Sequence, residues 1–128
     1  MIFETWKVEP GGTRGTQSEL NARYVALAGE LDALVAPVGA AWNELRSNGM
    51  NLFDPGGVHP NLRGSYLTAC VFYSLFYKAS PAGATYTFET KFDVKESYRK
   101  DLEDEKITPS DAEAIQRAAW KAVQAFRR

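Results

Sequence analysis

The stretch NLFDPGGVHPNLRGSYLTACVFYSLF, residues 51–76, decides how the rest of the chain is interpreted. It holds the only histidine, His59, just ahead of a long apolar run. A proline and two glycines before the histidine predict a tight turn, and Pro60 keeps the preceding residue extended. Asn61 is well suited to cap a helix over about 62–78. The stretch therefore predicts a histidine presented on a loop at the start of a helix.

The predicted helix over 62–78 is apolar around most of its circumference. Its apolar residues cannot all lie on one stripe, so we expect neighbours to bury it on several sides. A helix of this kind is expected to lie against a sheet. Cys70, inside it, is expected to be a small buried core residue, and a single cysteine excludes an internal disulfide.

The rest of the chain predicts more helix than strand. MIFETW, residues 1–6, is typical of a short strand, and VAP, before a turn at Pro37, of another. Amphipathic spacing predicts a helix over 17–34. A shorter helix is expected to end at Gly49, which is suited to a C-cap. A further helix is predicted within ITPSDAEAIQRAAWKAVQAFRR, residues 107–128.

Two of these helices have a clear apolar face. In the first, the residues expected to face the core are Leu20, Tyr24, Leu27, Ala28 and Leu31. In the last, Thr108 is the predicted N-cap, Pro109 takes the first turn and Asp111 completes a capping box. Its expected buried face comprises Ala112, Ile115, Ala119, Ala122, Val123 and Phe126. Between them, residues 88–106 are charged and are expected to form a solvated excursion.

The composition limits the classes of function. A chain of 128 residues is expected to form one domain, residues 1–128. Fifteen basic and sixteen acidic residues give a net charge of −1, which offers no electrostatic case for nucleic acid or an anionic membrane as partner. One histidine and one cysteine cannot build a usual zinc site, so neither metal nor cofactor is expected.

The chain shows no targeting pattern. MIFETWKVEP has neither the basic head nor the long apolar core of a signal peptide. The longest apolar-rich segment, YLTACVFYSLFY, is twelve residues long and too short to span a bilayer. The default expectation for the chain as written is a soluble, cytoplasmic protein. Any N-terminal half of a longer parent would carry its export signal, so localisation stays open.

The pattern GGVHPNLRGSYLTACVFYSLF, followed by SPAG, resembles the last block of the SGNH (GDSL-type) serine hydrolase superfamily. ETW before a glycine-rich loop, then YVALAGEL, APVGAAW and the closing helix, are similar to a bacterial subgroup of it. The likeness covers residues 1 to about 87 and resumes near residue 107. It implies an α/β fold: the C-terminal half of a three-layer α/β/α, flavodoxin-like domain, here incomplete, with few strands and predominantly helical content.

The resemblance also implies roles for individual residues. His59 matches the general base that activates a serine nucleophile. The family has an aspartate three residues before the histidine to orient the ring, but Gly56 stands there, and Asp54 is the candidate for that task. The Gly-Asp/Asn-Ser block of the nucleophile and the glycine and asparagine of the oxyanion hole have no counterpart in the chain.

Three hypotheses follow. In the first, the chain is the C-terminal part of an ester hydrolase, inert alone, that acts on a small-molecule ester when a missing N-terminal half supplies the serine. In the second, it is a non-catalytic remnant or interaction module that pairs through an exposed sheet edge with another chain or a second copy of itself. Gly56 favours the second. An independent enzyme using His59 with another nucleophile is least favoured, because a lone histidine is usually structural or exposed.

Other residues have structural interpretations. Trp42 is expected to pack in the core or, alternatively, to line a cleft beside the base. Tyr66 and Tyr73 are expected to be buried with their hydroxyls paired. DLEDE, residues 101–105, is expected to be a solvated face and not a metal site.

Overall fold

The computed structural model describes residues 1–8, 15–87 and 106–126 of the chain. The fold is mixed α/β and predominantly helical, as the sequence predicts. Its elements are, in order, β1 (Ile2–Phe3), α1 (Gln17–Glu30), β2 (Val35–Ala36), α2 (Val38–Ser47), α3 (Leu62–Tyr77) and α5 (Pro109–Ala125). The expected excursion over 88–106 lies outside the described residues, apart from the exposed Lys106.

Strands β1 and β2 form a parallel sheet, which has two strands in the described part of the chain. The paired positions are Ile2 with Val35 and Phe3 with Ala36. The N–H groups of Ile2 and Glu4 donate to the carbonyls of Leu34 and Ala36, at 2.7 and 3.0 Å. Because the backbone groups of successive residues in a strand point to opposite sides, those of Phe3 point away from β2. No other described strand pairs with that edge of β1.

The predicted N-caps of two helices are confirmed. The side chain of Asn61 accepts the N–H of Gly64 at 3.1 Å and starts α3. That of Thr108 accepts the N–H of Asp111 at 3.1 Å and starts α5, with Pro109 in its first turn. Both caps satisfy N–H groups that have no partner inside the helix.

Gly49 ends α2 as the sequence predicts. It adopts a φ of +87°, a left-handed conformation that glycine takes without steric cost. Its N–H donates to the carbonyl of Arg46, and the N–H of Met50 donates to that of Leu45, both at 3.0 Å. This pair of bonds is the Schellman pattern of helix termination.

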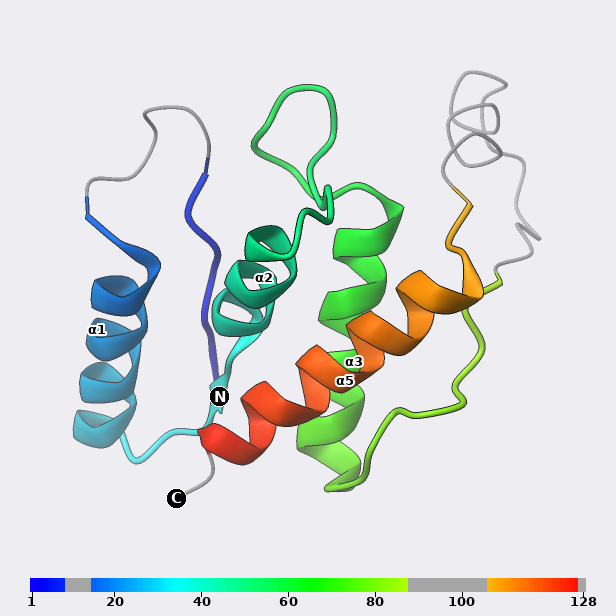
Figure 1. The fold of residues 1–128 in the computed structure, drawn as a ribbon. Coiled ribbons are helices and arrows are strands. Elements are labelled where there is room, and N and C mark those ends of the chain that lie inside the picture. The colour runs from blue at the N-terminus through cyan, green and yellow to red at the C-terminus, as the bar shows by residue number, and fades with distance from the viewer. Residues whose placement is uncertain (9–14, 88–105, 127–128) are drawn as a thin grey trace, which may run out of the picture.

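Helix α5 crosses α3 and also packs against α2, and these three helices enclose the core (Figure 1). Five residues of the predicted buried face of α5 are buried, while its last member, Phe126, is partly exposed. An ion pair joins the two long helices, with Arg63 Nε 2.8 Å from Asp111 Oδ2. The amphipathic pattern of α5 therefore predicted five of the six residues of its buried face correctly.

The prediction for α1 is wrong at its end and over most of its face. The helix stops at Glu30, several residues before 34, and Asp32 turns the chain with a φ of +46°. Of the five residues expected to face the core, Ala28 alone is buried, and Leu31 is 62 % exposed. The reason is that α1 packs mainly on α2 and β2.

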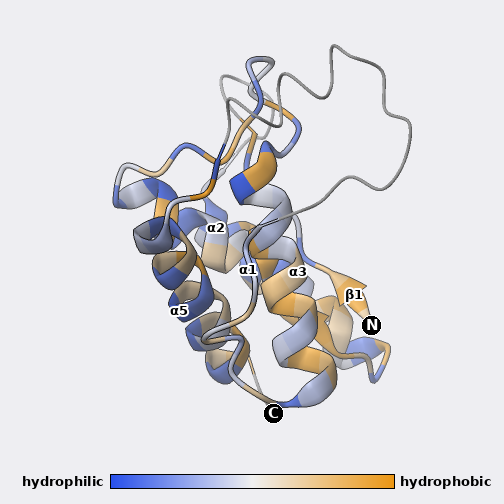
Figure 2. Cartoon of the chain, turned by 90° about the vertical axis from the view of Figure 1, so that its right-hand side faces the viewer, coloured by the Kyte–Doolittle hydropathy of each residue, from blue (hydrophilic) through white to orange (hydrophobic). Residues whose placement is uncertain are grey.

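The expectation that α3 is buried on several sides is also wrong in part. Phe76 and Tyr77 are 62 % and 72 % exposed, near the end of the helix. The ring of Phe72 lies 5.7 Å from that of Phe3 and 6.0 Å from that of Phe76. Figure 2 shows the hydrophobic ribbon of α3 beside β1. We call Phe3, Phe72 and Phe76, with the unpaired edge of β1, the open flank.

Candidate functional site

The side chain of His59 is exposed on the loop that connects α2 to α3. Figure 1 shows this loop beyond the carboxyl end of β1, directly before α3. In open sheets of parallel strands, ligands bind beyond the carboxyl ends of the strands. The loop therefore carries the histidine at the edge where chemistry is expected in this class of fold.

The loop is closed by its own backbone. Phe53 and Pro60 form an antiparallel bridge, and the N–H of Asp54 donates to the carbonyl of His59 at 2.9 Å. One step further along, the N–H of Asn61 donates to the carbonyl of Leu52 at 2.9 Å. These bonds hold the backbone of His59 in place and leave its imidazole free to meet another group.

Asp54 meets His59 through the backbone and not through the side chain. Its carboxylate lies over the turn that follows, where a Cβ added to Gly56 would be 3.3 Å from Oδ1. Oδ1 is buried and has no hydrogen-bond partner among the described residues, the ring of His59 included. The role of Asp54 as orienting carboxylate thus stays a prediction.

No serine hydroxyl in the described part of the chain is hydrogen-bonded to His59. The hydroxyl of Ser74 is buried and donates to a carbonyl within α3 at 2.8 Å. That of Ser47 likewise donates within α2, at 2.8 Å. Ser65 is exposed in the first turn of α3, and Ser97 lies outside the described residues. Among the described residues, His59 therefore has no serine as a hydrogen-bond partner.

Cys70 is not an alternative nucleophile. It is buried, as predicted, and burial raises the pKa of its thiol to about 11. The attacking species of a cysteine is the thiolate, which is scarce at neutral pH when the pKa is so high.

The two tyrosines differ. Tyr66 is buried with its hydroxyl paired, as predicted, donating to Ala84 at 3.2 Å and accepting from Gln116 at 2.8 Å. Burial raises the pKa of that hydroxyl. Tyr73 is 42 % exposed, so the prediction of its burial is wrong.

Trp42 packs in the core, directly below the loop that carries the histidine. It is 2 % exposed and therefore does not line a cleft. Trp6 stacks on it with ring centroids 4.1 Å apart, and Phe53 meets it edge-on at 5.0 Å. A Cβ on Gly64 would lie 2.6 Å from its Cη2 atom, so only glycine fits there. The stacked aromatic rings support the loop from below.

Glu4 is a buried carboxylate that the sequence did not identify. It follows β1, is fully buried, and accepts the N–H of Ala40 at 3.4 Å, at the start of α2. The side chain of Gln17 also bonds to it from α1. Burial outweighs these hydrogen bonds and raises its pKa to about 7. The only sequence signal was a carboxylate inside an otherwise strand-like stretch.

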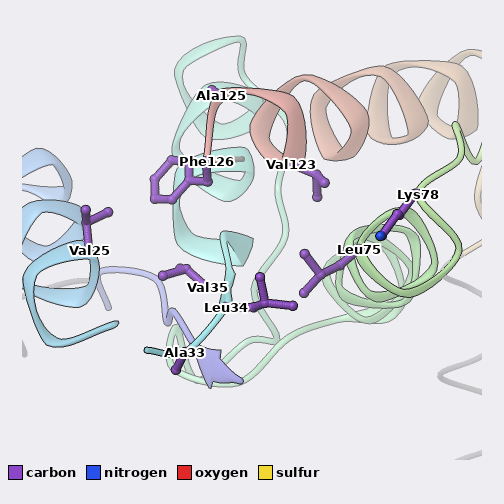
Figure 3. Close-up of a pocket in the computed structure, with 9 residues that line it drawn as sticks. All are labelled: Val25, Ala33, Leu34, Val35, Leu75, Lys78, Val123, Ala125 and Phe126. Carbon is purple, nitrogen blue, oxygen red and sulfur yellow. The ribbon is translucent and has the colours of Figure 1, made fainter. Parts of the chain in front are cut away.

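A groove of about 540 Å³ lies at the opposite end of α3 (Figure 3). The described residues that line it include apolar ones from α1, β2, α3 and α5, such as Val25, Val35 and Leu75, and one charged residue, Lys78. Helix α3 has 16 residues, a length of about 24 Å at 1.5 Å per residue. The described lining includes no histidine, serine or cysteine, and the groove is separate from His59.

The described residues contain no group of three or more side chains able to hold a metal ion. Within the same residues, none of the helices has both the length and the apolar character that a membrane crossing requires.

Comparisons of the chain with models of protein families, with curated proteins and with solved structures gave no match.

Proposed function

We propose that the chain carries the general base, His59, of an SGNH-like ester hydrolase whose nucleophilic serine and oxyanion hole belong to a polypeptide segment outside this chain. The observation that carries the proposal is the placement of His59: an exposed imidazole on a backbone-closed loop, beyond the carboxyl end of a parallel strand whose outer edge pairs with no other described strand. Alone, the chain is inert.

The open flank supports a missing neighbour. The backbone groups of Phe3 face away from β2, and an added strand would hydrogen-bond to them. The same strand would cover the exposed ring of Phe76, which lies next to Phe72 in α3. The extended sheet, with helices on both faces, would form the three-layer α/β/α domain that the resemblance implies.

The chemistry assigns His59 two proton transfers. A serine hydroxyl is a weak nucleophile unless a base in hydrogen-bond reach takes its proton as it attacks the ester carbonyl. His59 accepts that proton and then delivers it to the departing alcohol; in the second half it does the same for water. Fixed N–H donors on the added segment stabilise the negative charge on the carbonyl oxygen. The substrate is a small-molecule ester.

A second candidate is a non-catalytic interaction module that uses the same open flank. The observation that favours it is the carboxylate of Asp54, which makes no hydrogen bond to the imidazole, together with Gly56 at the family's aspartate position. Losing the orienting carboxylate lowers turnover by about 10⁴ in a serine protease. A module of this kind would bind the same neighbour without contributing to hydrolysis.

A fluorophosphonate probe, which reacts covalently with base-activated serines, separates the two candidates. The tagged chain is expressed in the cell that encodes it, recovered under native conditions with its bound neighbour, and exposed to the probe. We expect labelling of a serine on the neighbour with the wild-type chain and loss of labelling with His59→Ala, although both chains recover equal amounts of neighbour. Glu113→Gln, an exposed change on α5, is the matched control and should label normally.

Equal labelling of the neighbour with the wild-type and His59→Ala chains would overturn the catalytic role and favour the interaction module. Labelling of a serine in this chain would overturn the claim that the nucleophile lies elsewhere.

A further inference from the structure

One hydrogen bond ties the tip of the histidine loop to the rest of the molecule. The indole Nε1–H of Trp6 donates to the carbonyl of Val58, the residue directly before His59, at 3.2 Å. It spans 52 positions of the sequence. Among the described residues, no other hydrogen bond joins residues 54–60 to a segment outside the loop and the first turn of α3.

The donor of this bond is itself held firmly. The ring of Trp6 stacks almost parallel on that of Trp42, with an angle of 9° between the planes. The ring of Phe3 meets it edge-on, with centroids 6.2 Å apart. Trp42 is buried against Gly64 in the first turn of α3. A donor fixed in this way sets the position of the acceptor, because neither ring can turn without losing its packing.

Trp6 also has a defined place relative to the sheet. It lies two residues beyond Glu4, whose N–H makes the last hydrogen bond of β1 to β2. The bond to Val58 therefore relates the loop of His59 to the carboxyl end of β1, beside the unpaired edge. Without it, the loop retains its internal bonds but has no polar link to the strand.

We infer that Trp6 is the positioning residue for His59: its indole N–H holds the carbonyl of Val58 and so fixes the direction in which the imidazole is presented beyond β1. Its importance for hydrolysis rests on the proposed function, but the positioning itself does not. A base displaced by about 1 Å loses on the order of 10² in rate, which is why such a link matters.

The test uses Trp6→Phe in the isolated full chain, because phenylalanine keeps an aromatic ring next to Trp42 and removes the N–H together with the five-membered ring that carries it. His59 is the only histidine, so its imidazole gives an unambiguous NMR signal. We expect the variant to shift and broaden that signal and to speed hydrogen exchange at the amide of Asp54, which bonds to His59, by at least tenfold. The amide of Gly64, bonded to Asn61, should keep its exchange rate.

Trp120→Phe, on α5, is the control for loss of an indole elsewhere and should leave the imidazole signal in place. An unchanged imidazole signal in Trp6→Phe would overturn the inference. So would a uniform rise in exchange across the core, since that result shows a purely structural role.

The labelling experiment with the bound neighbour distinguishes this inference from the proposed function. Labelling that depends on His59 but is the same in wild type and Trp6→Phe overturns the positioning role and leaves the function standing. The opposite result is also informative. If Trp6→Phe changes the NMR signal locally, but the neighbour is labelled equally with the wild-type and His59→Ala chains, the proposed function is overturned and the positioning role stands.

Discussion

The two faces of α3 differ in how far neighbouring elements cover them. On its covered side, Leu67 and Val71 are fully buried. Toward the open flank, the equally apolar Phe76 is 62 % exposed. Local composition is alike on the two sides, so the difference lies in the presence of a neighbour. A helix that is apolar all round but covered on one side has a second packing surface.

The largest effect should come from a pair of truncations on this helix. Leu67→Ala should lower the free energy of unfolding by about 3 kcal/mol, because it opens a cavity in a closed core. Phe76→Ala should change it by less than about 0.5 kcal/mol, since the ring contributes mostly exposed surface. Urea denaturation followed by circular dichroism measures both. Similar losses for the two variants would show that the flank is already closed in solution.

The next effect concerns Glu4, which ties β1 to α1 and α2. Its folded pKa of about 7 lies above the ordinary value of 4.5. Between these values the folded state holds the proton more tightly than the unfolded state, so the free energy of unfolding falls as pH rises from 4.5 to 7. The full loss above that window is on the order of 3 kcal/mol.

Glu4→Gln is the matched variant, because a neutral amide of the same shape has no proton to lose. Urea denaturation at several pH values should show this contribution disappear, with the variant more stable than wild type at pH 8. A variant with the same pH dependence as wild type would assign the effect to another group.

A smaller contrast is expected between the helix caps of the two regions. Thr108→Ala should cost about 1 kcal/mol of global stability, since α5 belongs to the closed core. Thr16→Ala removes the cap of α1, where Thr16 forms a capping box with Glu19. Because α1 has an exposed apolar side, we expect that change to fray the helix locally. Hydrogen exchange should then quicken at the amide of Glu19 before the global transition moves. Equal global losses would place α1 in the same cooperative unit as α5.

The smallest effect on stability, and the sharpest on surface behaviour, is expected for Phe76→Glu. The change should leave the midpoint of urea unfolding almost unchanged and reduce binding of the dye ANS, which reports exposed apolar surface. Gln124→Glu, an exposed change on α5 that also adds one negative charge, is the control for altered charge. Dye binding that is the same in Phe76→Glu and wild type would show that the open flank is not an accessible apolar patch.

Features that depend on residues close in the sequence were predicted, and features that depend on tertiary contacts were not. The caps at Asn61 and Thr108 and the glycine at the end of α2 are short-range patterns, and they were predicted correctly. The exposed face of α1 was not, because amphipathic spacing shows which residues are able to be buried and not whether a neighbour covers them. Nor was Glu4, whose partners on α1 and α2 are brought to it by the tertiary fold.

The candidate site shows the same limit. The loop and the exposed position of His59 agree with what the prolines, the glycines and Asn61 predict. The contact between Trp6 and Val58 joins distant parts of the chain, and no local pattern indicates it. The direction of the Asp54 carboxylate depends on the backbone conformation of the glycine-rich turn. The residue types alone do not determine that conformation.

Turnover of a short-chain aryl ester by the purified chain tests the central claim most directly. If His59 must receive its proton from a hydroxyl on another segment, the chain and its His59→Ala variant should both hydrolyse the ester no faster than buffer does. Hydrolysis by the chain alone that disappears in His59→Ala would contradict the account, because the base would then already have its nucleophile within these residues.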